Sequence, residues 1–416
     1  MKYGLIGNQL GHSFSPQLHR MIGGYDYTLY QLDESDLPRF FAQRDFLGIN
    51  VTIPYKEAVL PYLDEISPAA AVIGAVNTVV NRNGRLWGYN TDFGGMIALI
   101  RKMGLDLFGK KVLILGSGGT AKTARAAADH LGALEIITVS RSGRSRAVTY
   151  AEAVRFHADA DYIINATPCG MYPALRECPI DVAPFQNLQG VIDAIYNPLS
   201  TRLVLEARRR GIAAEGGLYM LTAQAVLASE LFTGQAHAPG LIDTIFAKLL
   251  RQKRNLVLSG MPGCGKTSVG RDAAAMMGRR FVDLDREISQ CAGQPIPQIF
   301  ARSGEKVFRQ LESQAVQEIS GQTGLVIATG GGCILQHENV DALRQNGCLV
   351  LLDRPLAQLR PTEDRPLSDS VQKLEQLYIQ RMPIYRKAAD QIITTGKSVS
   401  ETAQTVVRRF DEVLIP

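Results

Sequence analysis

Residues 110–132 read KKVLILGSGGTAKTARAAADHLG, which combines an apolar run, a glycine-rich turn and an alanine-rich helical segment. Gly116, Gly118 and Ala121 in this stretch fit the pattern G-x-G-x-x-A. In such a turn the first glycine permits the tight bend, the second lets the backbone approach a pyrophosphate, and the small third residue lets the helix pack on the strand. The stretch predicts a parallel α/β fold with a dinucleotide-binding turn, and a plain strand-to-helix turn is the alternative.

The next strand-like run, EIITVS, ends in basic residues. Ser140 and Arg141 close the run, and Arg144 follows shortly after. A site for NAD usually carries Asp or Glu here to bind the ribose 2′-hydroxyl, whereas basic residues suit the additional 2′-phosphate of NADP. The pattern favours NADP, and a solvated basic loop is the alternative.

A second phosphate-binding pattern begins at Gly260, where GMPGCGKT fits GxxxxGK[ST]. The strand-like run NLVLSG leads into it, and the helical stretch SVGRDAAAMMG follows. In this pattern backbone N–H groups surround the phosphates, the lysine (Lys266) reaches the β and γ oxygens, and the Thr267 hydroxyl binds Mg²⁺. Because chance rarely places the pattern between a strand and a helix, we expect a nucleoside triphosphate site here.

The stretch FVDLD places Asp283 and Asp285 at the predicted end of the next strand. Residues two apart on a strand point the same way, so these carboxylates should converge beside the phosphate loop. Converging carboxylates are costly without a cation or a donor. We therefore expect Mg²⁺ at one and a substrate hydroxyl at the other, and two solvated loop acids are the alternative.

The whole chain has 416 residues, of which 46% are hydrophobic and 20% charged, so we expect a globular protein of two or three domains. Its net charge of +5 is too weak to indicate nucleic-acid binding. None of the six cysteines forms a CxxC pair, which speaks against a zinc site and favours a reducing, cytoplasmic setting. The N-terminus reads as a strand and turn rather than a signal peptide, and no apolar run reaches the ~18 residues that span a bilayer.

Short apolar runs alternate with helical periods along nearly the whole chain, which is typical of parallel α/β architecture. Strand-like runs at 2–6, 27–31 and 48–53 precede the dinucleotide turn, and EIITVS, DYIINAT and GVIDAIY follow its strand. Residues 217–234 and 240–250 read as helices, the second ending in RQKR. The pattern restarts at Asn255, so we place a boundary near 250–254 with no Pro/Gly/Ser-rich spacer.

Seven blocks of the first 250 residues resemble shikimate dehydrogenases, in the order found in that family: GLIGNQLGHSFSPQLH, GINVTIPYKEAV, IGAVNTVV, GYNTDFGG, GSGGTAKT, NATPCGMYP and GLYMLTAQAVLASELFTG. Residues 255–410 resemble shikimate kinases through GMPGCGKT, FVDLDREI, FARSGEKVFRQLE, TGGG, RPLSD and RMPIYRKAAD. The resemblance implies an α/β substrate-binding domain at 1–100, completed by a helix around 218–250. It further implies a Rossmann-type NADP domain at 101–217 and a P-loop NTPase-like kinase domain with a parallel sheet and a lid at 255–416.

In the first half the resemblance implies that Lys56 is catalytic and that Asp92 is its partner. An ammonium stabilises the negative charge that hydride reduction places on a ketone oxygen and can supply the proton. Taken alone, Lys56 reads as a surface lysine and Asp92 as the N-cap of the helix that follows it. Ser13 and Ser15 would hold the substrate carboxylate, although Ser15-Pro16 also reads as a helix N-cap and first residue. The other implied substrate contacts are Thr52, Asn77 and Gln224.

The resemblance also implies the residues that bind NADP. The family often has Asn-Arg-Thr after the second strand, where this chain has Ser140-Arg141-Ser142, a departure that bears on the adenosine contacts. Three residues, Thr167, Met171 and Gly217, would line the nicotinamide pocket. The remaining implied contacts are Gly116, Ser117, Gly118, Gly119, Thr120, Ala121, Ser140, Arg141 and Arg144.

In the second half the resemblance makes Asp285 the residue beside the acceptor hydroxyl, leaving Asp283 with Thr267 for the metal. Arg309 and Arg381 would pair with the shikimate carboxylate, because a planar guanidinium matches a carboxylate. The glycine run 330–332 would let the backbone approach the ring, and a flexible turn is its alternative. A lid would carry Arg365 to the transferring phosphoryl group. The stretch from Arg360 to Arg365, RPTEDR, is short for such a lid, and this chain has RPLS where the family favours RPLL. The implied ATP contacts are Gly263, Cys264, Gly265, Lys266, Thr267, Ser268, Arg360 and Arg365.

These observations lead to one functional hypothesis with two steps. NADPH would reduce 3-dehydroshikimate to shikimate, and MgATP would then phosphorylate the 3-hydroxyl of shikimate. One alternative is a quinate/shikimate dehydrogenase that uses NAD, and another is that one half is a ligand-sensing module. We expect small-molecule substrates as partners, no nucleic acid, no membrane, and a monomer or homodimer.

Overall fold

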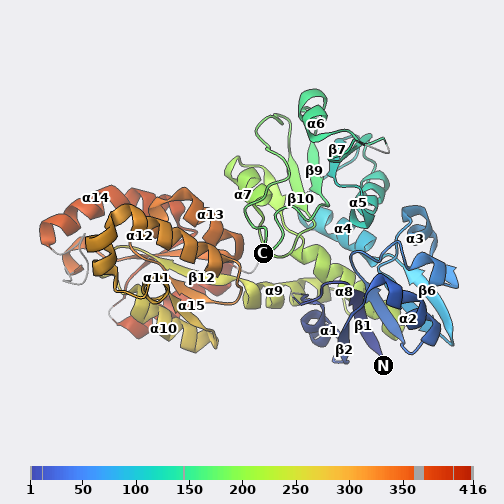
Figure 1. Cartoon of the computed structure of the whole chain (residues 1–416), viewed down its shortest axis with the longest axis horizontal. Coiled ribbons are helices and arrows are strands. Elements are labelled where there is room, and N and C mark those ends of the chain that lie inside the picture. The colour runs from blue at the N-terminus through green and yellow to red at the C-terminus, as the bar shows by residue number, and fades with distance from the viewer. Residues whose placement is uncertain (1, 12, 144–145, 360–369, 397, 414–416) are drawn as a thin grey trace. The chain divides into compact units, whose positions relative to one another are not determined.

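The chain divides into two units, residues 1–249 and 250–416, in a computed structural model. The structure describes residues 2–11, 13–143, 146–359, 370–396 and 398–413. Each unit is built from mixed α/β layers, so the predicted fold class is confirmed (Figure 1). Within the described residues, no helix is both long and apolar enough to cross a membrane.

The first unit begins with a six-stranded sheet of order β2-β1-β3-β5-β6-β4. Strands β1, β2 and β3 are parallel, whereas β5 runs antiparallel to β3 and to β6. The strands are β1 (Tyr3–Gly7), β2 (Tyr27–Gln31), β3 (Gly48–Val51), β4 (Glu65–Ile66), β5 (Thr78–Arg82) and β6 (Arg85–Tyr89), and the helices are α1 (Ser15–Gly23), α2 (Leu37–Gln43) and α3 (Pro68–Ile73).

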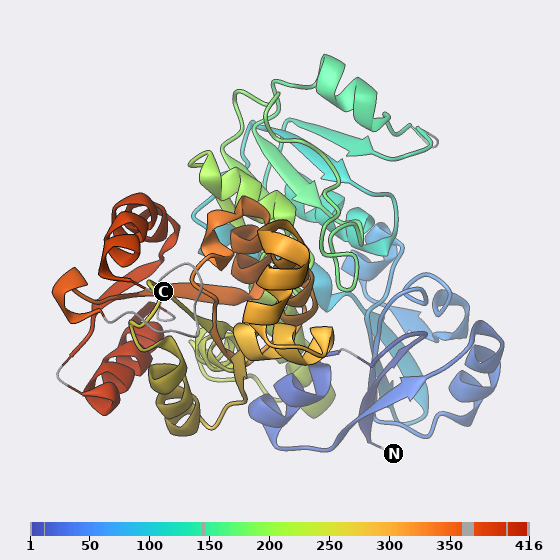
Figure 2. The same ribbon diagram turned by 60° about the vertical axis from the view of Figure 1, so that its left-hand side comes forward.

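A second, fully parallel sheet of order β11-β10-β9-β7-β8 completes the first unit. Its central strands are buried apolar runs, as expected for a sheet covered on both faces. Figure 2 shows it as a layer separate from the six-stranded sheet. Its elements are β7 (Lys111–Leu115), β8 (Glu135–Val139), β9 (Tyr162–Asn165), β10 (Gly190–Asp193), β11 (Ala213–Glu215), α4 (Thr91–Lys102), α5 (Gly119–His130), α6 (Tyr150–Phe156) and α7 (Arg202–Arg209).

Helix α8 (Leu218–Thr233) is the long apolar helix predicted at 217–234, and it packs on α4 and α1. Its Phe232 ring stacks on Tyr3 of β1, with ring centroids 5.2 Å apart. The helix after the parallel sheet therefore returns to the six-stranded sheet. Helix α9 (Leu241–Lys253) follows, and the division between the two units falls inside it.

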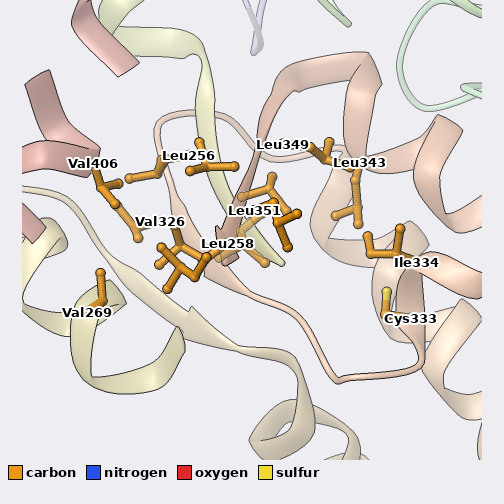
Figure 3. Packing of buried hydrophobic residues seen from close by; sticks show 14 of the residues in the cluster. Leu256, Leu258, Val269, Val326, Cys333, Ile334, Leu343, Leu349, Leu351 and Val406 are labelled. Carbon is orange, nitrogen blue, oxygen red and sulfur yellow. The ribbon is translucent and has the colours of Figure 1, made fainter. Parts of the chain in front are cut away.

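The second unit contains one parallel sheet of order β13-β14-β12-β15-β16. Figure 3 shows its core, with Val269 and Val406 on one side of the strands and Ile334 and Leu343 on the other. The elements are β12 (Asn255–Ser259), β13 (Phe281–Asp283), β14 (Val326–Ala328), β15 (Gly347–Asp353), β16 (Gln391–Thr394), α10 (Lys266–Met277), α11 (Leu284–Ala292), α12 (Ile296–Ser320), α13 (His337–Asn346), α14 (Val371–Ala388) and α15 (Val399–Val413).

Three local predictions were wrong. Asp285 is not on a strand with Asp283, because β13 ends at Asp283, which caps α11 by accepting a hydrogen bond from the Asp285 N–H. Ser15 is the first residue of α1 and Phe14 is its N-cap. The N-cap of α4 is Asn90, which accepts from the Phe93 N–H, and Asp92 lies in the first turn. In each case a neighbouring residue supplies the cap.

Candidate active sites

Lys56 and Asp92 form a close ion pair in the first unit. The Lys56 Nζ lies 2.6 Å from the Asp92 Oδ2, and the two side chains are only 14% and 10% exposed. Lys56 follows β3 by five residues, and the Asn90 cap fixes the first turn of α4 that carries Asp92. A largely buried ammonium held by a carboxylate has a defined position and can stabilise a developing oxyanion.

Asn77 and Gln224, two predicted substrate contacts, meet in a buried polar network around Thr91. The Asn77 Nδ2 donates to Thr91 Oγ1 at 3.0 Å and to Gln224 Oε1 at 3.5 Å, and the Thr91 N–H donates to Asn77 Oδ1 at 2.7 Å. Thr91 immediately precedes Asp92, so this network and the ion pair share one turn of α4. The structure therefore brings Lys56, Asn77, Asp92 and Gln224 together through α4.

Ser13, Ser15 and Thr52 make contacts of their own. The Ser13 Oγ accepts from the Ser15 N–H at 3.2 Å, and the ring of Tyr196 lies 5.2 Å from that of Phe14. Burial raises the pKa of Tyr196, and a hydrogen bond with the Ser13 side chain opposes the rise. Thr52 follows β3 and donates its N–H to the Ile6 carbonyl. Both serines thus lie at the start of α1, close to Tyr196, which follows strand β10 of the parallel sheet.

The predicted dinucleotide turn connects β7 to α5. Gly116 has φ +111°, a conformation that side chains disfavour, and Gly118 is the N-cap of α5. A Cβ placed on Gly118 would meet nothing within 4 Å, so a ligand has room beside it. A Cβ on Gly119 would lie 3.5 Å from the Lys56 Cβ, which puts the ion pair directly against this turn. These features fit a bound pyrophosphate.

A buried carboxylate supports the turn from the neighbouring strands. Asp193 accepts from Asn165 Nδ2 at 3.0 Å and from Thr201 Oγ1 at 2.6 Å, while Asn165 accepts from Thr167 Oγ1 at 2.7 Å. The Thr167 methyl group in turn lies 3.1 Å from where a Cβ on Gly116 would stand. Burial raises the pKa of Asp193 to about 6, although these donors oppose the rise.

The other predicted NADP residues differ in burial and contacts. Gly217 packs on the Ala194 carbonyl so closely that no side chain fits. Ser140 is buried and accepts from the Gly143 N–H, whereas Arg141 is exposed. Arg144 lies outside the described residues. Ser117 is exposed, Thr120 half-buried, Ala121 buried and Met171 40% exposed.

The phosphate loop of the second unit lies between β12 and α10. Its glycines Gly260, Gly263 and Gly265 have φ of +144°, +77° and +99°. The buried Lys266 Nζ donates to the Gly260 and Met261 carbonyls at 2.8 and 3.0 Å. Of the remaining predicted ATP contacts, Cys264 is buried and Ser268 exposed, while Arg360 and Arg365 lie outside the described residues.

Thr267 and Asp283 fit the predicted Mg²⁺ site. The Thr267 Oγ1 donates to the Asp283 Oδ2 at 2.7 Å, so a hydroxyl and a carboxylate meet at the edge of the phosphate loop. Mg²⁺ prefers such oxygen ligands and usually keeps several waters beside them. In the described ranges, no group of three or more His, Cys, Asp or Glu side chains is arranged so that it could hold a metal ion.

A cavity of about 580 Å³ opens beside the phosphate loop and contains every described residue predicted to bind shikimate. A Cβ on Gly330 would lie 2.6 Å from Asp285 Oδ1, and one on Gly331 would lie 3.1 Å from Pro262 of the phosphate loop. A Cβ on Gly332 would overlap the Arg309 guanidinium. The run thus links the acceptor site to the phosphate loop, and it leaves no space for side chains. The predicted residues in the cavity are Asp285, Arg309, Gly330, Gly331, Gly332 and Arg381.

Charge inside this cavity is balanced by a residue that the sequence reasoning missed. Glu312 is 1% exposed and lies 2.7 Å from Arg309, which Glu305 also contacts at 2.9 Å. Burial raises the pKa of Glu312, and the positive charge of Arg309 opposes that rise. Burial alone would lower the pKa of Arg309, but the two glutamates outweigh burial and raise it. The spacing FRQLE puts Glu312 three residues after Arg309 on one helix face, which could have revealed the pair.

Other residues at the two sites also escaped the sequence reasoning. Tyr385 and Arg381 both donate to the Gly331 carbonyl, and their i, i+4 spacing in RMPIY was the available signal. Thr91 and Asn90 adjoin Asp92 in GYNTDF. Nothing in the sequence pattern connects Asp193 to Asn165, because strand pairing alone brings them together.

Comparisons with known proteins agree with both halves of the chain. The family model "Shikimate dehydrogenase substrate binding domain" matches residues 5–79, and the model "Shikimate kinase" matches residues 262–411. The shikimate dehydrogenase (NADP(+)) of Moorella thermoacetica is 34% identical over 288 residues, covering 63% of this chain and 96% of the relative. That of Symbiobacterium thermophilum is 36% identical over 265 residues, 56% of this chain and 88% of the relative.

Solved structures give the same result for the first unit. A chorismate mutase/shikimate 5-dehydrogenase fusion protein from Clostridium acetobutylicum matches 60% of this chain and 96% of its own, with a TM-score of 0.57 and 34% identity. Shikimate 5-dehydrogenase from Thermus thermophilus, solved with NADP(H) and shikimate, matches 60% of this chain and 99% of its own, with a TM-score of 0.53 and 31% identity.

Proposed function

Because the chain belongs to the shikimate dehydrogenase family and continues into a shikimate kinase domain, we propose that it is a bifunctional enzyme that first makes shikimate and then phosphorylates it. The first unit would reduce 3-dehydroshikimate with NADPH. The second would transfer phosphate from MgATP to the 3-hydroxyl of shikimate. NADPH supplies the hydride and MgATP the phosphoryl group.

The contact between Gly119 and Lys56 carries the proposal for the first unit. The Lys56 side chain lies within 3.6 Å of where a Cβ on Gly119 would stand, so the lysine that would donate the proton lies next to the turn that would hold the dinucleotide. Lys56 would donate the proton to the ketone oxygen, with Asp92 holding the lysine in position. Asn77, Thr91 and Gln224 offer amide and hydroxyl groups to the ring hydroxyls.

The contacts of the run 330–332 carry the proposal for the second unit. They place Asp285, Glu312 and Arg309 within one cavity that begins at the phosphate loop. Arg309 and Arg381 offer planar guanidinium groups to a carboxylate. Asp285 would accept the proton of the acceptor hydroxyl or orient it, while Lys266 and Thr267 hold the phosphate side.

Two lysine substitutions in the full chain test the pair of activities. We expect Lys56→Ala to lower the dehydrogenase kcat by about 10²–10⁴-fold and to leave the kinase intact, since proton transfer contributes on that order. Lys266→Ala should abolish the kinase and spare NADPH oxidation. Lys102→Ala and Lys387→Ala, which change exposed lysines, serve as matched controls. Loss of both reactions in either variant would contradict independent sites.

The choice of NADP rests on the exposed Arg141 after β8 and on relatives such as those of Moorella thermoacetica and Symbiobacterium thermophilum, which are named for NADP(+). Two of the similar solved structures, a quinate dehydrogenase from Corynebacterium glutamicum and a shikimate 5-dehydrogenase from Listeria monocytogenes, contain NAD. Oxidation rates of wild type with NADP+ and with NAD+, each paired with shikimate and with quinate, test the choice. A preference for NAD+, or for quinate over shikimate, would support the alternative of an NAD-dependent quinate/shikimate dehydrogenase. All six cysteines are free, which suits the reducing cytoplasm in which we place the protein.

A further inference from the structure

Arg354 lies immediately after β15, at the carboxyl end of the strands of the second unit, where the phosphate loop also begins. Strand β15 pairs in parallel with β12, so the residues that follow these strands are neighbours. A Cβ on Gly260 would lie 2.7 Å from the Leu352 carbonyl, which shows how closely the end of β15 approaches the loop. Arg354 Nη1 donates to the Gly263 carbonyl at 3.4 Å. A guanidinium from β15 is therefore held against the loop.

The charge of Arg354 has no compensating carboxylate in the described ranges. Its neighbour Asp353 is engaged by Arg386, with Arg386 Nη2 at 3.1 Å from Asp353 Oδ2. The half-buried Arg354 has a buried Nε for which the described part of the chain provides no hydrogen-bond partner. Leaving a buried charged donor unsatisfied is costly. A site with this arrangement is suited to an anionic ligand.

Lys266 offers a direct comparison, because it too rests on loop carbonyls. Its Nζ donates to the Gly260 and Met261 carbonyls, just as Arg354 donates to that of Gly263. Two cations, one at the start of α10 and one just after β15, are thus placed against one phosphate loop. Arginine adds a fork of donors that matches phosphate oxygens.

We propose that Arg354 binds a phosphate oxygen of the nucleotide in the second unit. The inference rests on the proposed kinase function, since it assumes that this loop holds a nucleoside triphosphate. Arg354 would be a further positively charged residue at the site, and it lies within the described residues, whereas Arg360 and Arg365 lie outside them. The competing role, in which Arg354 only fixes the loop through the Gly263 carbonyl, needs a donor but not a charge.

Equilibrium binding of a non-hydrolysable ATP analogue with Mg²⁺, in the full chain and without shikimate, separates these roles. We expect Arg354→Gln, which keeps a donor and removes the charge, to weaken binding by about 10- to 100-fold and to reduce its salt dependence. Arg354→Lys, which keeps the charge, should recover most of that loss. Arg386→Gln, the matched control on the adjacent side chain, should bind like wild type. Dehydrogenase rates should be unchanged in all three variants.

The outcomes separate this inference from the proposed function. Wild type that binds the analogue while Arg354→Gln binds equally well would overturn the role of Arg354 alone. Equal losses in Arg354→Gln and Arg354→Lys would show that the positive charge does not account for the residue's role and would likewise overturn it. Wild type that does not bind the analogue would overturn the kinase proposal and, with it, this inference.

Discussion

The two glycine-rich turns of this chain are supported in opposite ways. The turn at 116–121 is supported by residues outside it. Thr167, Asn165 and Asp193 form a row of hydrogen bonds beside the turn, from the end of β9 to the end of β10. The loop at 260–267 is held by its own residues, because Lys266 bonds back to two of its carbonyls. The first turn leaves open space at Gly118, whereas the second folds tightly around its lysine.

This difference shows where each turn is vulnerable. A turn supported from outside should respond to changes in distant strands, whereas a self-supported loop should respond to changes within itself. The sole tryptophan, Trp87, lies in the first unit, so its fluorescence reports the unfolding of that unit. Five substitutions test the contrast.

The largest effect is expected from Gly260→Ala. The residue has φ +144°, and a Cβ there would lie 2.7 Å from the Leu352 carbonyl and 2.9 Å from Cys264 Sγ. Strain and overlap together should cost about 3 kcal/mol or more and lower the kinase rate at least 100-fold. ADP release measures this, with NADPH oxidation by the same sample as reference.

Gly118→Ala is the matched change in the other turn. Its φ is −82° and a Cβ would meet nothing, so the unfolding of the first unit followed by Trp87 should shift by less than about 1 kcal/mol. The KM for NADPH should rise, because the added methyl group would stand where the pyrophosphate approaches. Equal destabilisation by Gly118→Ala and Gly260→Ala would remove the contrast.

The next effect concerns the external support at Asp193 and depends on pH. Burial raises the folded-state pKa from 3.8 to about 6, so the folded state favours the protonated acid. The stabilisation from this group is therefore full below about pH 4 and is lost as the pH rises to about 6, amounting to about 3 kcal/mol.

Asp193→Asn removes this titration and provides the measurement. Urea unfolding followed by Trp87 gives the free energy of unfolding of both proteins at pH 4.5 and pH 7. Wild type should lose stability relative to the variant as the pH rises. A difference between the two proteins that stays constant with pH would show that Asp193 does not titrate as described.

A smaller effect is expected from Asp92→Asn, which leaves Lys56 without its carboxylate. The dehydrogenase kcat should fall by about 100-fold with little change in the KM for NADPH, since the lysine loses its orientation but the turn remains. Asp243→Asn is the control, because Asp243 pairs with Lys102 at an exposed site and should be neutral. Unequal kinase activity among these proteins would argue against independent units.

The smallest effect is expected from Glu57→Gln. Glu57 Oε2 lies 2.6 Å from Lys122 Nζ of α5, and both side chains are more than 40% exposed. Exposed pairs of this kind contribute about 0.2–1 kcal/mol, so the first unit should lose no more than that. Measuring unfolding at low and high salt tests it, because the difference should vanish when salt screens the pair.

The sequence predicted the parts that depend on contiguous residues. Both glycine turns, the strands leading into them and the helix α8 follow local patterns, so the fold class and the centres of both sites could be predicted. Ser15 and Asp92 were each misjudged as a helix N-cap, because a residue one or two positions earlier is the N-cap. Asp285 was misjudged as a strand residue, because β13 ends at Asp283 and a helix begins there. Glu312 is a different failure, since its importance comes from burial opposite Gly330.

The tertiary supports could not be predicted at all. Asp193 and Asn165 are 28 residues apart and meet only through the pairing of β9 with β10. Tyr196 forms a hydrogen bond with the Ser13 side chain, although the two residues are far apart in the sequence. Such contacts depend on how sheets and helices are placed, which no local spacing encodes. The roles assigned to the site residues therefore stay predictions that the variants above test.

The crowding around Gly332 also limits which base changes its codon tolerates. Every base change in the first two letters of a glycine codon introduces a residue with a Cβ or a stop, and any Cβ at this position would collide with the Arg309 guanidinium. Only the third letter is free to vary without disturbing the arginine. An amino-acid substitution at this codon is therefore accommodated only by moving the Arg309 side chain away from the carboxylate site proposed for it.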